Sequence, residues 1–369
     1  MITALLIIGL FFLVLINVPI GVALGAVALV GMVTTKGTDS IYNAALTMFD
    51  GATNFPLLAI PLFILAGALM NTTSISRRLI NLTSALIGFV RGGLAMVNVG
   101  VSMFFAEISG SAVADVAAIG SVLIPAMKNR SYTPELSAAV TSSSASIAII
   151  IPPSIAMIIY GALSDTSIVQ LFVAGIIPGV LGGFSMMGLC YWYAVRYNLP
   201  REEAFSLRRL WDAFKEAGWA LTLPVIILGG IFGGIVTATE GAGLAVVAAL
   251  IIGGFIYREI NWTHLRKAMV EGVIQTAVVM LLVATSAVLG LYLTEMQVPQ
   301  HFANWMMSFT SNKIMVLALL NVMLFIVGMF LHGAAAIILI VPIVMPLVHQ
   351  LGINPIQFGL IMTLNIAIG

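Results

Sequence analysis

Residues that could hold a small ion or an organic acid are concentrated in one part of an otherwise apolar sequence. They are Glu107, Ser109, Gly110, Ser111, Asp115, Thr141, Ser142, Ser143, Ser144, Ser146, Pro152, Pro153 and Ser154. Each proline lacks an amide donor and blocks a helical hydrogen bond, so the pair frees carbonyl groups near Ala148 to Ile150. Free carbonyls and hydroxyls at membrane depth suit a hard cation such as sodium, and exposed amides after Ser111 suit a carboxylate.

The same residues also have simpler interpretations. Serine and glycine allow membrane helices to pack closely, which needs no ligand. A carboxyl group at membrane depth is costly, so Glu107 and Asp115 are candidates for function. We favour a capping role for Asp115, which lies near the first turn of the helix that we expect after Ser111. We assign no role to Glu107.

A second, sparser set of polar residues lies near the end of the sequence. It comprises His332, Gly333, Thr363, Asn365 and Gly369. His332 could titrate or contact an anionic substrate, or it could serve only as a hydrogen-bonding group. Glu240, in the run from Thr237 to Gly243, lies at a turn between two apolar segments. There we favour capping of the following helix over a role in transport.

Composition places the chain in a membrane. Of its 369 residues 61% are hydrophobic and 8% are charged, and the mean hydropathy is +1.13. A soluble domain carries about 25% charged residues, so soluble enzymes, secreted disulfide scaffolds and nucleic-acid binders are excluded. The net charge is +1, and the single cysteine, Cys190, cannot form an internal disulfide.

Apolar segments recur along the chain and predict an all-α polytopic membrane protein. The segments are 2–34, 55–71, 93–127, 133–163, 169–195, 217–236, 240–257, 271–293, 313–348 and 355 onward. The start lacks a basic region and a cleavage site, so we interpret it as a membrane segment rather than a signal peptide. Whether 2–34 forms one kinked span or two is open.

Two of these segments are predicted to be re-entrant helical hairpins. Glycine turns interrupt 93–127 at Gly110 and 313–348 at Gly333, and each half is about 16 residues, or ~24 Å, short of a ~30 Å hydrocarbon core. The helix at 133–163 is predicted to break at Pro152-Pro153. The more polar segments 74–91 and 297–312 are typical of helices lying at the membrane interface.

Lys and Arg residues indicate one consistent topology. They gather in 196–216 and 258–270, which two predicted spans separate, so both loops lie on the side that we assign to the cytoplasm. The segment 294–312 falls on the opposite side and has no Lys or Arg.

The sequence contains a weak internal repeat. At an offset of 223 Gly67, Asn81, Asn98 and Gly110 match Gly290, Asn304, Asn321 and Gly333, and at 221 Pro125, Pro134 and Ser144 align with Pro346, Pro355 and Asn365. Chance could produce a few such identities. An odd number of predicted crossings separates the two units, however, and inverted repeats with broken helices are typical of secondary transporters. The break equivalent to Pro152-Pro153 would fall at 373–374, so we expect a chain truncated at its C-terminus.

Motifs of common enzymes are missing from the sequence. There is no HExxH motif and no Asp-rich prenyl-diphosphate motif. There is also no Walker A loop, so the chain itself does not drive transport by ATP hydrolysis. The four histidines, His264, His301, His332 and His349, are not paired at metal-ligand spacing.

Four motifs resemble the large membrane subunit of tripartite ATP-independent periplasmic (TRAP) transporters. They are Ser109 to Met127, Ile151 to Ser154, Thr237 to Glu240 and Ile343 to Pro346. The resemblance covers nearly the whole chain and implies the ion transporter superfamily with an elevator mechanism. This sequence has Ala148 where the family usually has glycine, and Ala238 where the family usually has proline.

The resemblance also implies a domain division. Scaffold helices would occupy 1–71 and 164–293, arm helices 72–92 and 294–312, and transport-domain repeats 93–163 and 313–369.

The same resemblance implies ligands and partners. A first cation site would use Ser109, Gly110, Ser111, Ser144, Ser146, Ala148 and Ile151, a second Gly333, Asn365 and Gly369, and a substrate site Ser143, Pro152, Pro153, Ser154 and His332. Two or more sodium ions would drive import, with no organic cofactor. A small four-helix membrane (Q) subunit and a periplasmic binding (P) protein would assist, in the bacterial inner membrane.

We therefore expect a binding-protein-dependent, sodium-coupled importer of a carboxylate such as a sialic acid or a C4-dicarboxylate. The nearest alternative is a sodium/dicarboxylate symporter that needs no binding protein. An ion channel or an intramembrane enzyme is less consistent with the sequence, which has neither a filter of repeated short loops nor a catalytic motif.

Overall fold

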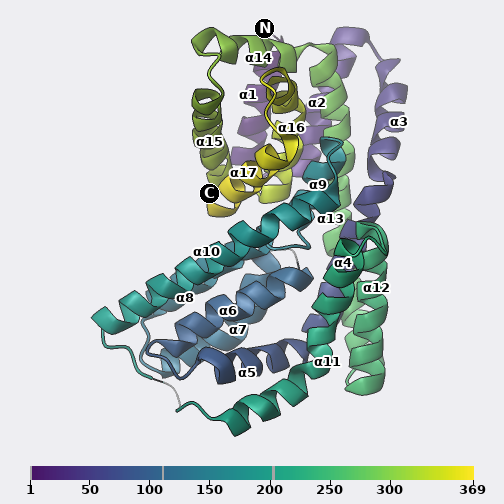
Figure 1. The fold of residues 1–369 in the computed structure, drawn as a ribbon. Helices are drawn as coiled ribbons and strands as arrows, with labels where there is room; N and C mark the ends of the chain where they lie inside the picture. Colours follow the sequence, from purple (N-terminus) through teal and green to yellow (C-terminus); the bar gives the residue numbers. More distant parts are fainter. Residues whose placement is uncertain (1, 110–111, 202–203) are drawn as a thin grey trace. The chain divides into compact units, whose positions relative to one another are not determined.

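The computed structural model describes residues 2–109, 112–201 and 204–369, and within these ranges the chain is helical (Figure 1). Those residues form 17 α-helices and no named strand, only an isolated bridge between Arg91 and Arg201. The all-α prediction is confirmed.

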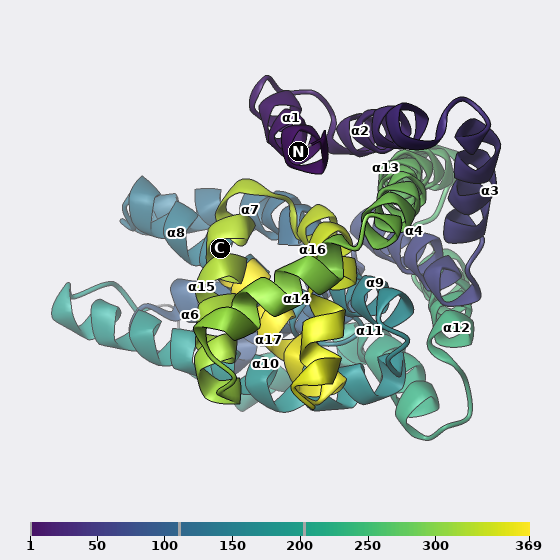
Figure 2. The same ribbon diagram turned by 90° about the horizontal axis from the view of Figure 1, so that it is seen from above.

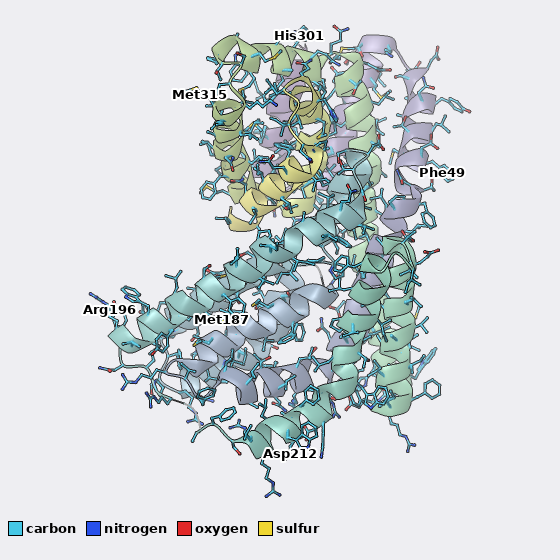
Figure 3. The ribbon with its side chains drawn as sticks, in the orientation of Figure 1. Phe49, Met187, Arg196, Asp212, His301 and Met315 are labelled. Carbon is cyan, nitrogen blue, oxygen red and sulfur yellow. The ribbon has the colours of Figure 1, made fainter. Side chains whose placement is uncertain are left out.

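Six helices of the described residues are long and apolar enough to cross a membrane, or seven if Ser40–Ala52 and Phe55–Asn71 count as one interrupted span. The six are α10 (Ile168–Arg196), α11 (Leu207–Phe232), α12 with its π-helical extension (Ala238–Ile256), α13 (Trp262–Glu295), α15 (Lys313–Phe330) and α16 (Gly333–Gln350). Large apolar side chains also cover outer faces: Phe49 of α3 (Ser40–Ala52) and Met315 of α15 are 65% and 58% exposed (Figure 3). Such a surface needs lipid around it, and the chain is a multi-pass membrane protein.

The chain forms two compact units, which we describe separately. Unit 1 comprises 1–58, 158–168 and 274–369, and unit 2 comprises 59–157 and 169–273. The predicted transport domain, which joins both repeats, stays a prediction.

In unit 1 the first apolar segment folds into two helices rather than one kinked span. α1 (Ile2–Leu15) ends before Asn17, whose φ of 67° turns the chain, and α2 (Ile20–Lys36) packs back against α1. A Cβ added at Gly31 of α2 would lie 2.8 Å from Cζ of Tyr292 on α13, so glycine permits this close approach. An ion pair of 2.6 Å between Lys36 and Glu295 joins the ends of the same two helices.

The second predicted hairpin is also in unit 1. α15 and α16 meet at Leu331-His332, as the glycine turn predicted, but each arm has 18 residues, about 27 Å and longer than expected. The preceding segment, which was predicted to lie at the membrane interface, forms α14 (Val298–Phe309). α14 packs on α16, while α15 packs on α17 (Pro355–Ile368) (Figure 2).

Unit 2 holds the first hairpin, α6 (Gly93–Ser109) and α7 (Ala112–Asn129), which pack against each other and against α8 (Pro134–Ala145). As predicted, the helix after the hairpin is broken: α8 passes into the 3-10 turn η2 (Ser146–Ile149), and α9 (Ile155–Leu163) begins beyond the prolines. Around the hairpin, α4 (Ala59–Asn71) packs on α12 and α5 (Ile75–Ile87) packs on α11. A buried apolar core that includes Leu79, Val101 and Leu223 joins these helices.

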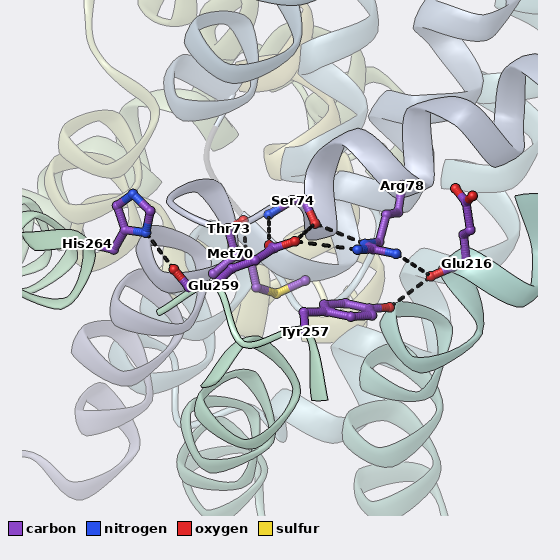
Figure 4. Close-up of polar contacts among 8 residues, drawn as sticks. All are labelled: Met70, Thr73, Ser74, Arg78, Glu216, Tyr257, Glu259 and His264. Carbon is purple, nitrogen blue, oxygen red and sulfur yellow. Dashed lines mark hydrogen bonds and ion pairs between the residues drawn. The ribbon is translucent and has the colours of Figure 1, made fainter. Parts of the chain in front are cut away.

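The N-terminus of α5 is capped by a carboxylate from a distant loop (Figure 4). Glu259 accepts hydrogen bonds from the Ser74 amide, at 2.7 Å, and from the Ser74 hydroxyl, at 2.5 Å. Arg78 pairs with Glu259 at 3.4 Å, and its guanidinium lies 4.0 Å from the centre of the Tyr257 ring. A negative charge at a helix N-terminus is stabilising, so this contact fixes the start of α5 to the loop between α12 and α13.

The surroundings of Glu259 also set its protonation. Partial burial by itself raises the pKa of the carboxyl group, but the hydrogen bonds from Ser74 and the charge of Arg78 outweigh burial and hold the pKa below its usual value.

Candidate functional site

A buried polar cluster in unit 2 connects the first hairpin to the broken helix. Nδ2 of Asn98, on α6, donates to the Thr141 hydroxyl of α8 at 2.7 Å, and the Ser144 hydroxyl lies 3.2 Å from Oδ1 of Asn98. Ser102 donates to Ser144 at 2.9 Å. All four side chains are at most 1% exposed. Buried polar groups need such partners, so the cluster fixes the position of α8 on α6 and orients the Ser144 hydroxyl.

The break after α8 is stabilised by its own serine. Pro152-Pro153 is a cis peptide bond, and residues 151–154 are buried. The Ser154 hydroxyl donates to the Ile149 carbonyl at 2.6 Å and accepts from the Met157 amide at 3.4 Å. One of the carbonyl groups that the prolines free is therefore occupied by Ser154.

α10 packs tightly against this break through two glycines. A Cβ at Gly175 would lie 2.7 Å from the Ile150 carbonyl oxygen, and one at Gly179 would lie 2.6 Å from Cγ1 of Ile151. Both distances are far below normal contact, so only glycine fits there without displacing the break.

The other residues predicted for the first cation site differ in burial, and some of them lie outside the described residues. Gly110 and Ser111 lie outside the described residues, as do the side chains of Ser109 and Glu107. Ala148 is fully buried and Ile151 nearly so. Ser146 is partly exposed and donates to the Ser143 carbonyl at 2.7 Å, while the Ser143 side chain, predicted for the substrate, is exposed.

The two acidic residues predicted to be structural occupy helix starts. Asp115 is buried in the first turn of α7. Glu240 is the third residue of a capping box at the start of α12: its Oε2 accepts from the Thr237 amide at 2.8 Å, and its own amide donates to the Thr237 hydroxyl at 3.3 Å.

In unit 1 a pair of asparagines joins α15 to α17. Nδ2 of Asn365 donates to Oδ1 of Asn321 at 2.5 Å and to the Ile361 carbonyl at 2.7 Å. Nδ2 of Asn321 in turn donates to the Leu317 carbonyl at 2.8 Å.

The three residues of the second predicted cation site lie on elements that touch one another. A Cβ at Gly333 would lie 3.2 Å from Cγ2 of Ile366, the residue after Asn365. A Cβ at Gly369 would lie 2.7 Å from the Phe325 carbonyl oxygen, and one at Gly328 would lie 3.3 Å from Cα of Gly369. Gly333, Asn365 and Gly369 are thus grouped beside the turn of the second hairpin.

His332, the remaining substrate candidate, sits at the N-cap of α16. Its side chain is exposed and forms no cap hydrogen bond, while its carbonyl accepts from the Ala336 amide at 3.0 Å. His332 directly precedes the backbone amides that begin α16, and the amides of a helix N-terminus suit an anion.

The two clusters occupy equivalent positions of the internal repeat. Asn98 aligns with Asn321 and Ser144 with Asn365, and in both units the hairpin residue hydrogen-bonds the residue of the following helix. Sequence reasoning used both asparagines to define the repeat but assigned them no site role. Their alignment at one offset was the signal that could have identified them.

The chemistry of these clusters is that of oxygen donors. They offer hydroxyl, amide and backbone carbonyl oxygens, which suit a hard cation without d-electron preferences. No group of three or more His, Cys, Asp or Glu side chains that could bind a metal ion occurs among the described residues.

An apolar cavity of about 240 Å³ in unit 1, lined by Leu10, Tyr292 and Ile340 among others, contains none of the candidate residues.

Comparison with known proteins places this chain among transport proteins. The family model "Tripartite ATP-independent periplasmic transporter, DctM component" matches residues 7–369. The isethionate TRAP transporter permease protein DctMQ of Oleidesulfovibrio alaskensis is 41% identical over 355 residues, covering 96% of this chain but 56% of that protein. The C4-dicarboxylate TRAP transporter large permease protein DctM of Pseudomonas aeruginosa is 38% identical, covering 90% of this chain and 78% of that protein.

A solved structure supports the fold. The YdaH transporter of Alcanivorax borkumensis, described as having an unusual topology, matches with a TM-score of 0.62 at 14% identity, over 90% of this chain and 77% of that chain.

Proposed function

Because the chain belongs to the DctM component family of tripartite ATP-independent periplasmic transporters, we propose that it is the large membrane subunit of a sodium-coupled importer of small organic acids. The match to the family over residues 7–369 carries this proposal. Members of the family are transporter permeases, so the chain is a transport component and not an enzyme.

The names of the relatives support an acidic substrate. One relative is named for isethionate and another for C4-dicarboxylates, and both are small anions. A carboxylate, of the C4-dicarboxylate or sialic acid class, remains the substrate that we propose for this chain. The proposed contact in unit 1 is the exposed His332 at the start of α16, and in unit 2 the proposed contacts are the residues around Pro152-Pro153.

The sodium sites rest on the oxygen donors of the two clusters. We assign Ser144, with Ser146, Ala148 and Ile151, to the first site together with Ser109, Gly110 and Ser111. Gly333, Asn365 and Gly369 form the second site. Hydroxyl and carbonyl oxygens at helix breaks coordinate sodium in other secondary transporters.

Partners and movement follow from the same assignment. The name DctMQ of the longer isethionate relative supports a small membrane Q subunit, and the family description supports a periplasmic binding protein. In the proposed elevator cycle in the inner membrane, the hairpins and broken helices move against the remaining helices.

Reconstitution tests the dependence on a binding protein. The complete permease with its small subunit is placed in proteoliposomes, and uptake of labelled C4-dicarboxylates and sialic acids is measured with and without the purified binding protein. Uptake only in its presence supports the proposal. Equal uptake in its absence would assign the chain to the stand-alone symporters instead.

A further inference from the structure

We propose that Asn321 is a positioning residue that fixes the side-chain amide of Asn365 so that its carbonyl oxygen is presented to the second cation site. This inference rests on the proposed sodium coupling. It concerns a residue that none of the predicted sites included, on the first arm of the second hairpin.

The hydrogen bonds determine the orientation of both amides. A side-chain amide has two donor hydrogens on nitrogen and an acceptor oxygen. Nδ2 of Asn321 donates to the Leu317 carbonyl four residues earlier on α15, so its Oδ1 is the atom that faces α17. Oδ1 can only accept, and the partner that it selects is Nδ2 of Asn365, at 2.5 Å.

Both hydrogens of the Asn365 amide are then engaged. Nδ2 donates to Asn321 and to the Ile361 carbonyl at 2.7 Å. A rotated amide would place its oxygen against two acceptor oxygens, which is repulsive. The carbonyl oxygen of Asn365 is therefore the part of the amide that is left for a ligand, and a carbonyl oxygen is a suitable ligand for sodium.

The surroundings of Asn365 make this orientation relevant to a cation. Asn365 lies one helical turn before Gly369, whose amide donates to the Asn365 backbone carbonyl at 2.9 Å. The next residue, Ile366, contacts Gly333 at the start of α16. The oriented amide thus belongs to the same group of residues as the predicted site.

The other repeat uses the same device with a serine. Asn98 donates to Thr141 and so presents Oδ1 to the Ser144 hydroxyl. Ser144 is the residue that aligns with Asn365. In both repeats the oxygen of the hairpin asparagine accepts from the aligned residue of the following helix, which favours a shared role over chance.

The test is thermal unfolding of the purified complete permease across a sodium series, with choline keeping ionic strength constant. A ligand that binds only the folded state raises the melting temperature by an amount set by its concentration relative to its dissociation constant. We expect Asn321→Leu to require roughly tenfold more sodium than the wild type for the same rise in melting temperature, a change that corresponds to about one lost hydrogen bond. Asn365→Leu should have at least this effect, and the double variant should be no worse than Asn365→Leu.

Asn304→Leu is the matched control, because Asn304 is exposed on α14, and it should leave the sodium series unchanged. If Asn321→Leu does not fold, Asn321→Ser, a smaller change, is measured in its place. A wild-type sodium response in an Asn321 variant, with a weakened response in Asn365→Leu, would overturn the inference and leave the proposed function intact. No sodium response in the wild type would overturn both the sodium coupling and this inference.

Discussion

The Ser144 hydroxyl of α8 lies 3.2 Å from Oδ1 of Asn98 on α6, and both side chains are fully buried. This contact joins the first arm of a hairpin to the helix that breaks at Pro152-Pro153. The hydrogen bonds with Asn98 and Ser102 hold the Ser144 oxygen in a fixed position. A residue held in this way can act as a cation ligand without a further ordering cost.

Replacing Ser144 with Ala should weaken the sodium dependence of uptake. The substitution removes the proposed ligand oxygen and leaves Oδ1 of Asn98 without this donor, so we expect about a fivefold or greater increase in the sodium concentration for half-maximal uptake, the size of one lost hydrogen bond. Ser142→Ala is the control, since Ser142 is exposed and its hydroxyl donates to the Ala139 carbonyl of its own helix. An unchanged half-saturation in Ser144→Ala would remove this residue from the site.

Glu259→Gln should destabilise the protein at neutral pH by weakening the cap on α5. The folded-state pKa of Glu259 is lowered, so its contribution to stability is present above the unfolded-state pKa of about 4.3. It is lost as the pH falls through the folded-state pKa. Unfolding measured from pH 7 downward should therefore show the difference between wild type and variant shrinking in acid, and a difference that grew in acid would contradict this account.

Glu240→Ala should lower thermal stability more than Glu240→Gln. Glutamine can still accept from the Thr237 amide in a capping box, whereas alanine cannot. Both variants should keep wild-type sodium dependence in the melting series described for Asn321. A loss of sodium dependence with unchanged stability would show that Glu240 belongs to the transport machinery instead.

Gly175→Ala should destabilise the permease by about 1–3 kcal/mol, the usual cost of overpacking. Its methyl group would lie 2.7 Å from the Ile150 carbonyl oxygen at the helix break. Gly182→Ala on the same helix is the matched control, because nothing lies within 4 Å of the added Cβ. Alanine also favours helix more than glycine does, so the control should be neutral or slightly stabilising; equal destabilisation in both would refute the packing argument.

The sequence predicted the elements well because their signals are local. Gly333 and Pro152-Pro153 mark the second hairpin turn and the helix break where the structure has them. Two apolar helices joined at Asn17 could not be distinguished from one kinked span, because the choice depends on packing of α1 on α2. Contacts between distant residues were beyond sequence reasoning: nothing in the local pattern pairs Ser74 with Glu259, 185 positions away.

The candidate sites were predictable as residue types and not as contacts. Ser144 and Asn365 were assigned to the sites through the resemblance to the family, and the internal repeat aligned them with each other. Their partners Asn98 and Asn321 were visible only as repeat matches, since a hydrogen bond across two helices depends on the rotation of each helix. Ser154 was predicted as a substrate contact, but its hydroxyl donates to the Ile149 carbonyl. The residues around Ser154 in the sequence do not indicate this hydrogen bond.

The measurement that tests the central claim most directly is uptake under separately imposed ion gradients. Proteoliposomes with the complete permease, its small subunit and the binding protein are given an inward sodium gradient or an inward proton gradient, and accumulation of a labelled organic acid is followed. We predict accumulation with the sodium gradient and none with the proton gradient alone. Accumulation driven by protons without sodium would contradict the account.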